Sequence, residues 1–281
     1  MSPLVGIIKI GIDPVFHLGP LAIHWYGVGY AVAIIVGLEV ALPYVERHGI
    51  SRSQAGWIAF WTIIASLVGG RLFYDLQSGA AYYFTHPAET FAVWQGGMAF
   101  FGAILLGSAT LLFMAWREKV NFWVLLDAGV LFAAIGQPIG RIGNIINGDI
   151  LGYPSNLPWA TAYTNPNSFA PRLGVAYQPA AAYEALVILL VLGLLIYLRR
   201  RGVADGVVGI VYMVLYPITQ IGIFFLRNPV NVPVIAFGLK QAQLTSLGVL
   251  LIGVPLLIYA WRRTNRGRGT APAALPAPPG A

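Results

Sequence analysis

The sequence predicts an all-α integral membrane protein with about seven transmembrane helices. Its 281 residues are 58% hydrophobic and only 10% charged, whereas a soluble globular domain carries roughly 25% charged residues. The apolar residues form long unbroken runs, and a membrane β-barrel would instead show short segments of alternating polarity. The 33 glycines favour closely packed membrane helices. These observations together exclude a disordered chain and a soluble domain.

Seven apolar runs are long enough to cross a bilayer, which takes about 20 residues in a helix. They cover residues 25–44, 55–76, 93–116, 122–139, 183–198, 207–226 and 239–261. The fourth run contains Asp127, Gly136 and Pro138. Because an ionisable group inside a membrane is costly and often functional, Asp127 is predicted to have a structural or electrostatic role.

Two segments differ in composition from the spans. Residues 141–180 are rich in Pro, Asn, Tyr and Gly, which predicts an external loop domain between the fourth and fifth spans. Residues 264–281 are rich in Pro, Ala and Gly, which predicts a disordered cytoplasmic tail. The remaining chain, residues 1–263, is predicted to form a single transmembrane domain.

The distribution of basic residues predicts the orientation, because cytoplasmic loops of membrane proteins are enriched in Lys and Arg. With an external N-terminus and a cytoplasmic C-terminus, 11 of the 17 basic residues lie inside. The six outer cations are Lys9, Arg71, Arg141, Arg172, Arg227 and Lys240. Topology does not explain these six, so they are candidates for other roles. Arg71 is predicted to form a structural pair with Asp75, four residues further along the same helix.

The chain contains no cysteine. It therefore supplies no thiol nucleophile and no thiolate ligand, and any sulfur chemistry must come from a substrate. No spacing of His, Asp and Glu indicates a metal site, and no cofactor is expected. The formal charge of +7 is assigned to cytoplasmic loops rather than to nucleic-acid binding.

The end of the fourth span carries the most distinctive chemical pattern. Residues 140–149 read Gly-Arg-Ile-Gly-Asn-Ile-Ile-Asn-Gly-Asp, and Gly152 follows. Glycines let backbone N–H groups approach an anion, and Arg141 offers a planar fork that suits a phosphate. The alternative is an arginine that reaches the membrane surface beside turn-forming residues at a helix end.

This pattern, with Gln137 and Pro138 before it, closely resembles the signature of the prolipoprotein diacylglyceryl transferase family, which reads G-R-x-G-N-[FI]-x-N-x-E-x-x-G. Shorter similarities follow the order of that family over residues 21–263. They are Trp25-Tyr26-Gly27, Gly70-Arg71-Leu72-Phe73-Tyr74, Trp94-Gln95-Gly96-Gly97-Met98, Tyr183-Glu184, Tyr216, Arg227-Asn228-Pro229 and Gln243.

The resemblance implies an enzyme of the bacterial cytoplasmic (inner) membrane. Such an enzyme moves a diacylglyceryl group from phosphatidylglycerol to the lipobox cysteine thiol of a prolipoprotein, which is the first step of bacterial lipoprotein maturation. A thioether forms and glycerol phosphate leaves. The implied partners are therefore phosphatidylglycerol, prolipoproteins and membrane lipids, and residues 1–263 become one catalytic domain.

The resemblance also implies roles for individual residues. By position, Arg141 would bind the phosphatidylglycerol head group, and Tyr26 would face it from the first span. These two residues are the predicted catalytic residues. Asn144, Asp149 and Gly152 would shape the pocket. The charge on a departing phosphate needs cations, so Arg227 is a further candidate for substrate binding.

Several positions depart from the family pattern. Asp149 replaces a Glu of the signature. Elsewhere the usual residues are replaced as follows: His by Phe101, His by Gln178, Arg by Gln220 and Glu by Phe224. The missing arginine at Gln220 is the most serious change, and it leaves open a catalytically silent lipid- or lipoprotein-binding homologue. A small transporter is a third alternative, which would need a polar path near the membrane midplane.

Overall fold

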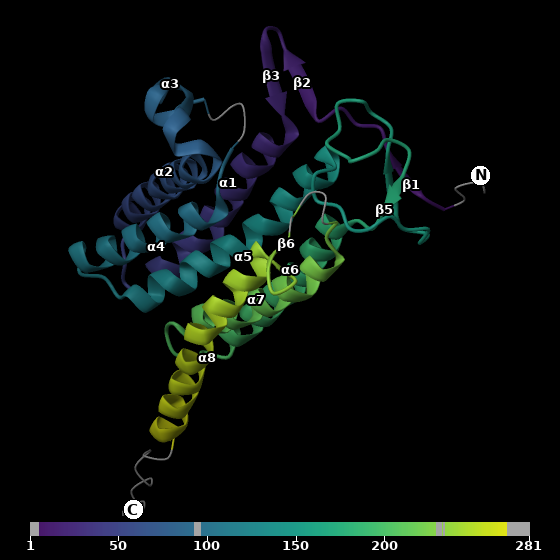
Figure 1. The fold of residues 1–281 in the computed structure, drawn as a ribbon. Helices are drawn as coiled ribbons and strands as arrows, with labels where there is room; N and C mark the ends of the chain where they lie inside the picture. The colour runs from purple at the N-terminus through teal and green to yellow at the C-terminus, as the bar shows by residue number, and fades with distance from the viewer. Residues whose placement is uncertain (1–5, 93–96, 229–231, 233, 269–281) are drawn as a thin grey trace, which may run out of the picture. The chain divides into compact units, whose positions relative to one another are not determined.

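The computed structural model describes residues 6–92, 97–228, 232 and 234–268. The elements in chain order are β1 (Ile8–Ile10), β2 (Val15–Leu18), β3 (Leu21–His24), α1 (Trp25–Glu46), α2 (Arg52–Thr85), α3 (Pro87–Thr90), α4 (Phe100–Arg117), α5 (Phe122–Asn147), β4 (Thr161–Tyr163), β5 (Ala176–Tyr177), α6 (Ala180–Arg200), α7 (Val207–Leu226), β6 (Val234–Ala236), β7 (Leu239–Lys240) and α8 (Gln241–Arg268). Figure 1 shows that long helices dominate the fold.

The predicted spans correspond to helices of the structure. Within the described residues, six helices are long and apolar enough to cross a membrane, namely α1, α2, α5, α6, α7 and α8. The third predicted span corresponds to α4, whose apolar part, Gly102–Arg117, is shorter. The all-α, multi-pass class is thus confirmed, with six to seven candidate spans. The sixth span has the predicted bounds, Val207–Leu226.

Two predicted boundaries need correction. The fourth span continues as α5 to Asn147, so the signature residues Arg141 and Asn144 lie on a helix and the irregular insertion starts at Gly148. The isoleucines between the polar residues keep the segment apolar enough to remain helical. The seventh span continues as α8 to Arg268, so residues 264–268 of the predicted disordered tail are helical. The rest of that tail lies outside the described residues.

The chain divides into two compact units. One contains residues up to Leu38 and from Val130 onward, and the other is Glu39–Gly129. The boundaries fall inside α1 and α5. That residues 1–263 form one catalytic domain stays a prediction, because the presence of two compact units does not show which of them carries out chemistry.

In the unit Glu39–Gly129, glycines allow α2 and α4 to pack closely. A Cβ atom at Gly69 would lie 2.3 Å from the carbonyl oxygen of Gly102, and one at Gly107 would lie 2.1 Å from the Ser66 hydroxyl. Such contact of small residues replaces hydrophobic burial as the source of helix association in a membrane. The second span is predicted to end at residue 76. In the structure α2 continues to Thr85, with an interruption of the regular helix at Gly79, whose φ is 142°.

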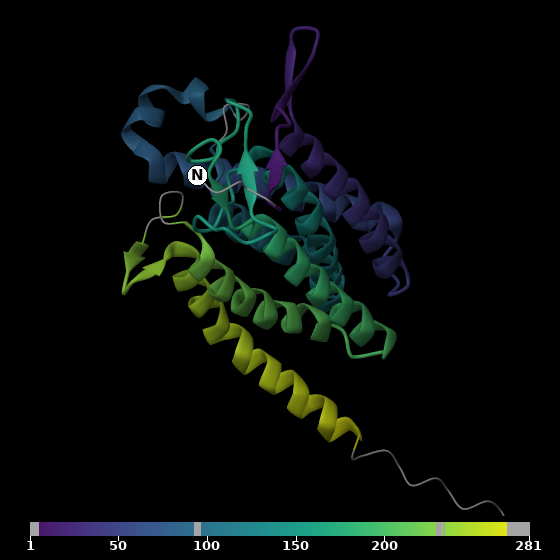
Figure 2. The same ribbon diagram turned by 90° about the vertical axis from the view of Figure 1, so that its right-hand side faces the viewer.

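In the other unit, α7 packs against both α6 and α8, and Figures 1 and 2 show α7 and α8 side by side. The insertion after α5 contributes β4 and β5 to a small sheet in the order β1-β4-β5, in which β1, from the N-terminal segment, is parallel to β4 and β4 is antiparallel to β5. Its core consists of Leu151, Tyr163 and Tyr177. The external loop predicted from composition is therefore an ordered segment next to the signature helix.

Candidate functional site

The signature residues are brought together by the last turns of α5. Arg141 and Asn144 are three residues apart on this helix, and Arg141 Nη1 donates a hydrogen bond to Asn144 Oδ1 at 3.0 Å. Asn144 is buried, with 3% of its surface exposed. Residues at this spacing share a helix face, so the extension of α5 to Asn147 brings the two side chains together.

Gly148 turns the chain back toward the helix. Its φ is +76°, a conformation that favours glycine, and its N–H donates to the Asn144 carbonyl at 2.9 Å. The turn places Asp149 beside Asn144, whose Nδ2 lies 3.2 Å from Oδ1 and 3.1 Å from Oδ2 of that carboxylate. Burial raises the pKa of the Asp149 carboxyl above its ordinary value, and the bond from Asn144 opposes this rise.

We expect Gly148→Ala to lower the thermal midpoint of the protein in detergent more than Gly202→Ala. Both glycines have positive φ, at 76° and 65°, so each alanine costs about 1–2 kcal/mol in conformation. A Cβ at position 148 would additionally lie 2.9 Å from the Tyr163 ring, whereas nothing lies within 4 Å at Gly202. Equal midpoints for the two variants would contradict this account of the turn.

Glu184 on α6 is the centre of the cluster, and sequence reasoning did not select it. Only 1% of its surface is exposed. Its Oε1 accepts a hydrogen bond from Arg141 Nη2, which forms an ion pair, and another from Gln220 Nε2 at 3.1 Å. A lone carboxylate inside an apolar run was the available signal, because such a group is costly in a membrane without a partner.

Gln220 therefore has a definite place in the structure. It is buried at 6% exposure in α7, where it holds the same carboxylate oxygen that Arg141 binds. A neutral donor at this position leaves Arg141 and Glu184 as a charge-balanced pair. Buried ion pairs need such additional hydrogen bonds to offset their desolvation.

Arg227 directly follows α7 and has an extended backbone, with φ −68° and ψ 135°. Seven residues span about two turns of a helix, which would put Arg227 on the same face as Gln220. Because Arg227 lies outside α7, this helical periodicity does not determine the position of its side chain. Gly152 forms an antiparallel bridge with Arg227, and a Cβ at Gly152 would lie 2.8 Å from the Leu226 carbonyl oxygen. Glycine at position 152 thus permits the loop to pair with the end of α7.

Two arginine donors in this cluster have no acceptor in the part of the protein that the structure describes. Arg227 is buried at 7% exposure, and the Arg141 side chain is 22% exposed. Within the described residues, the Nε atoms of Arg141 and Arg227 lack a hydrogen-bond partner, as does Oε2 of Glu184. A buried polar group without a partner is costly, so these donors indicate a place for an anionic ligand.

Tyr26 packs against the signature helix. A Cβ at Gly143 would lie 2.9 Å from the Tyr26 Cα, so this glycine allows α1 and α5 to approach closely. The Tyr26 hydroxyl is hydrogen-bonded to that of Tyr30 at 2.5 Å. The structure therefore places Tyr26 beside the signature residues of α5.

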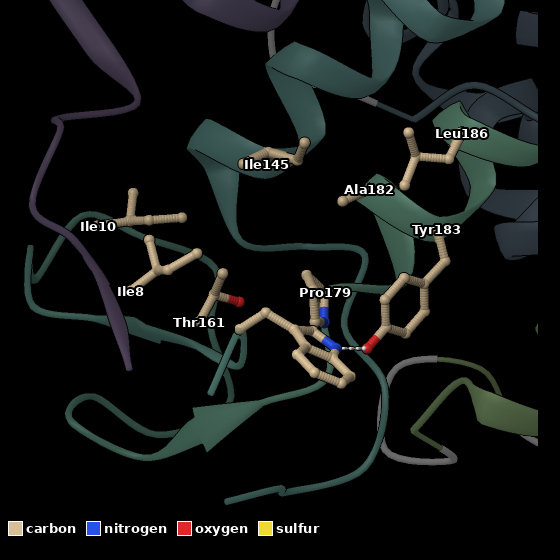
Figure 3. A pocket seen from close by; sticks show the side chains of 9 residues that line it. Ile8, Ile10, Ile145, Thr161, Pro179, Ala182, Tyr183 and Leu186 are labelled. Carbon is tan, nitrogen blue, oxygen red and sulfur yellow. Dashed lines mark hydrogen bonds between the residues drawn. The ribbon is translucent and has the colours of Figure 1, made fainter. Parts of the chain in front are cut away.

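An apolar pocket of about 460 Å³ is lined by residues adjacent in sequence to members of this cluster. Figure 3 shows its lining. It includes Ile145 and Tyr183, the neighbours of Asn144 and Glu184 in the chain. Trp159 Nε1 donates to the Tyr183 hydroxyl at 2.6 Å. None of the predicted site residues lines this pocket.

Other predicted ionisable residues have structural partners in the unit Glu39–Gly129. The predicted pairing of Arg71 with Asp75 is confirmed, at 3.2 Å between Nε and Oδ1. Arg71 Nη1 also donates to the carbonyl of Gly97 at 3.1 Å. The Tyr44 hydroxyl donates to Asp127 at 3.1 Å. The side chain of Phe101, one of the departures, lies outside the described residues.

The fold and this cluster define a multi-pass membrane protein with ionisable groups gathered where α5, α6 and α7 meet the loop after α5. The sequence model described as prolipoprotein diacylglyceryl transferase matches residues 14–259. The chain belongs to this family.

Several relatives carry the name phosphatidylglycerol–prolipoprotein diacylglyceryl transferase. The protein of Paraburkholderia xenovorans is 31% identical over 92% of this chain and 97% of its own length. That of Paraburkholderia phytofirmans is 32% identical over 92% of this chain and 96% of its own length. That of Burkholderia orbicola is 31% identical over 92% and 97%, respectively. The match thus extends over nearly the whole of both chains and includes the signature.

Proposed function

We propose that this protein transfers the diacylglyceryl group of phosphatidylglycerol to the lipobox cysteine thiol of prolipoproteins, and that Arg141 and Arg227 bind the lipid phosphate. Membership of the family supports the reaction. The observation that supports the site is the pair of arginine Nε donors that lack a protein acceptor within the described residues.

The proposed reaction makes one bond and breaks another. The substrate thiol loses its proton, and the thiolate sulfur attacks the glycerol carbon of the diacylglyceryl group. A carbon–sulfur bond forms, the carbon–oxygen bond to phosphate breaks, and glycerol phosphate leaves with the electron pair. The chain has no cysteine of its own, so the sulfur belongs to the prolipoprotein.

Arg141 has the geometry for the phosphate role. Its guanidinium is held by Asn144 through Nη1 and by Glu184 through Nη2, and its buried Nε has no acceptor within the described residues. A held guanidinium is already oriented when charge develops on the leaving group, so little reorganisation is needed. In this proposal Asn144, Asp149 and Gly152 maintain the pocket, and Tyr26 closes it from α1.

The direct experiment incubates the purified protein with phosphatidylglycerol and a lipobox peptide and measures the thioether product by mass spectrometry. We expect product that depends on both substrates. A protein that binds the lipid or the peptide but forms no product would be the silent homologue. Failure to bind either would leave the family reaction without support in this chain.

The proposed location is the bacterial cytoplasmic membrane, with the N-terminus outside and the C-terminus in the cytoplasm. The uneven distribution of basic residues supports this orientation. In this proposed orientation the insertion after α5 is external, so the cluster lies toward the outer face.

We expect single cysteines at Asn156 and Gly202 to be labelled from opposite sides of the membrane. Both positions are exposed, and the natural chain contains no competing thiol. In intact cells, an impermeant maleimide should label Asn156→Cys, and it should label Gly202→Cys only after the membrane is opened. The reverse pattern would overturn the orientation.

A further inference from the structure

Lys240 is a buried cation that the proposed mechanism does not use. It lies in β7, directly before α8, and only 5% of its surface is exposed. Burying an ammonium group is expensive unless it is paired and hydrogen-bonded. The partners of Lys240 therefore indicate what the residue does.

The ammonium group of Lys240 binds the end of α7. Its Nζ donates hydrogen bonds to the carbonyl oxygens of Phe224, at 2.6 Å, and of Arg227. The last carbonyls of a helix have no partner within the helix and form the negative end of its dipole. Lys240 satisfies two carbonyls there and supplies the complementary charge.

Gln243 extends this contact along α7. Its side-chain oxygen accepts from the Lys240 backbone N–H at 3.0 Å, and its Nε2 donates to the Ile221 carbonyl at 3.1 Å. Gln243 is buried, with 1% exposed. The two side chains together bind three carbonyls spaced three residues apart, and we call Lys240 and Gln243 the carbonyl clamp.

The same point is tied to the loop that follows the signature. Lys240 Nζ lies 5.9 Å from the centroid of the Tyr153 ring, within the range of a cation–π interaction. The Tyr153 N–H donates to the Leu226 carbonyl at 3.2 Å. The clamp thus joins the start of α8, the end of α7 and the loop that contains Gly152.

We propose that Lys240 is a positioning residue, which fixes the backbone of Arg227 so that its guanidinium meets the phosphate of an anionic lipid head group. This inference rests on the proposed function. Arg227 lies beyond the last residue of α7, so the hydrogen bonds within that helix do not hold it. The carbonyl clamp and the bridge to Gly152 hold it instead.

The test is a double-mutant cycle with Lys240→Met and Arg227→Gln, read as kcat/KM for phosphatidylglycerol in mixed micelles. We expect Lys240→Met to lower kcat/KM roughly ten- to hundredfold, since it removes hydrogen bonds from a charged donor. If Lys240 acts through Arg227, the double variant matches Arg227→Gln within about twofold. Losses that multiply in the double variant would overturn the proposal.

Lys9→Met is the matched control, because Lys9 is an exposed lysine on β1 of the same unit. Lys9→Met should retain the wild-type kcat/KM. If the kcat/KM of Lys240→Met equals that of Lys9→Met, the proposal is also overturned. If Lys240→Met does not insert in the membrane, Lys240→Gln replaces it in the double-mutant cycle with Arg227→Gln. The glutamine keeps a side-chain amide donor for the same carbonyls.

Hydrogen exchange separates a failure of this inference from a failure of the proposed function. An inactive wild-type protein would refute the transfer reaction. In that case the carbonyl clamp is tested by the exchange rates of the backbone amides of Tyr153 and Asn228, which donate to the carbonyls of Leu226 and Leu151, respectively. Faster exchange of these amides in Lys240→Met than in Lys9→Met supports the clamp. Unchanged exchange overturns it.

Discussion

Arg141→Ala is expected to abolish thioether formation while the protein still inserts in the membrane. The variant loses the guanidinium that is held by Asn144 and Glu184, and removing one donor that stabilises developing charge costs roughly 10²–10³ in rate. The measurement is product formation with phosphatidylglycerol and a lipobox peptide, at matched amounts of folded protein in detergent.

Two further variants define the result for Arg141. Arg141→Lys keeps the charge and loses the planar fork, so we expect a strong defect as well. Arg172→Ala removes an exposed arginine of the loop after α5 and should retain activity. Normal product formation by folded Arg141→Ala would show that Arg141 does not bind the phosphate.

Glu184→Gln is expected to have the second-largest effect, on both stability and activity. The variant keeps the shape of the side chain and removes the charge that faces Arg141. Breaking one side of a buried ion pair typically costs about 3–5 kcal/mol of stability, because the remaining charge is left uncompensated. The thermal midpoint should fall, and kcat/KM for phosphatidylglycerol should fall because Arg141 is no longer held.

Glu39→Gln is the matched control for this prediction. Glu39 lies in α1, and its side chain is 66% exposed beside Arg52 at 3.5 Å. Exposed ion pairs contribute about 0–1 kcal/mol, so this change should leave the midpoint and the activity near wild type. Equal behaviour of the two variants would contradict the central role of Glu184.

The contacts of Glu184 also change the meaning of the most serious departure from the family pattern. An arginine missing at position 220 suggested lost support for the phosphate. In the structure, Gln220 donates to Glu184 Oε1, so it stabilises the partner of Arg141. Gln220 therefore does not by itself imply a catalytically silent homologue. The assay with phosphatidylglycerol and a lipobox peptide distinguishes an active transferase from a silent homologue.

Local sequence was sufficient for several features because their physics is local. The apolar runs determined the spans, and the helix spacing determined the Arg71–Asp75 pair. The apolar run predicts an end of α5 that is too early, because the polar signature residues interrupt the run after residue 139. The intervening isoleucines and the turn at Gly148 place that end at Asn147 instead.

The sequence by itself determined the membrane class, the order of the helices and the family to which the chain belongs. These follow from composition, from the apolar runs and from a contiguous motif. Only the tertiary structure decided that Glu184 binds both Arg141 and Gln220, and that Lys240 holds the end of α7. Those contacts join residues far apart in the chain, and the cost of burying a charge reveals a partner only once the fold has brought it within hydrogen-bonding distance.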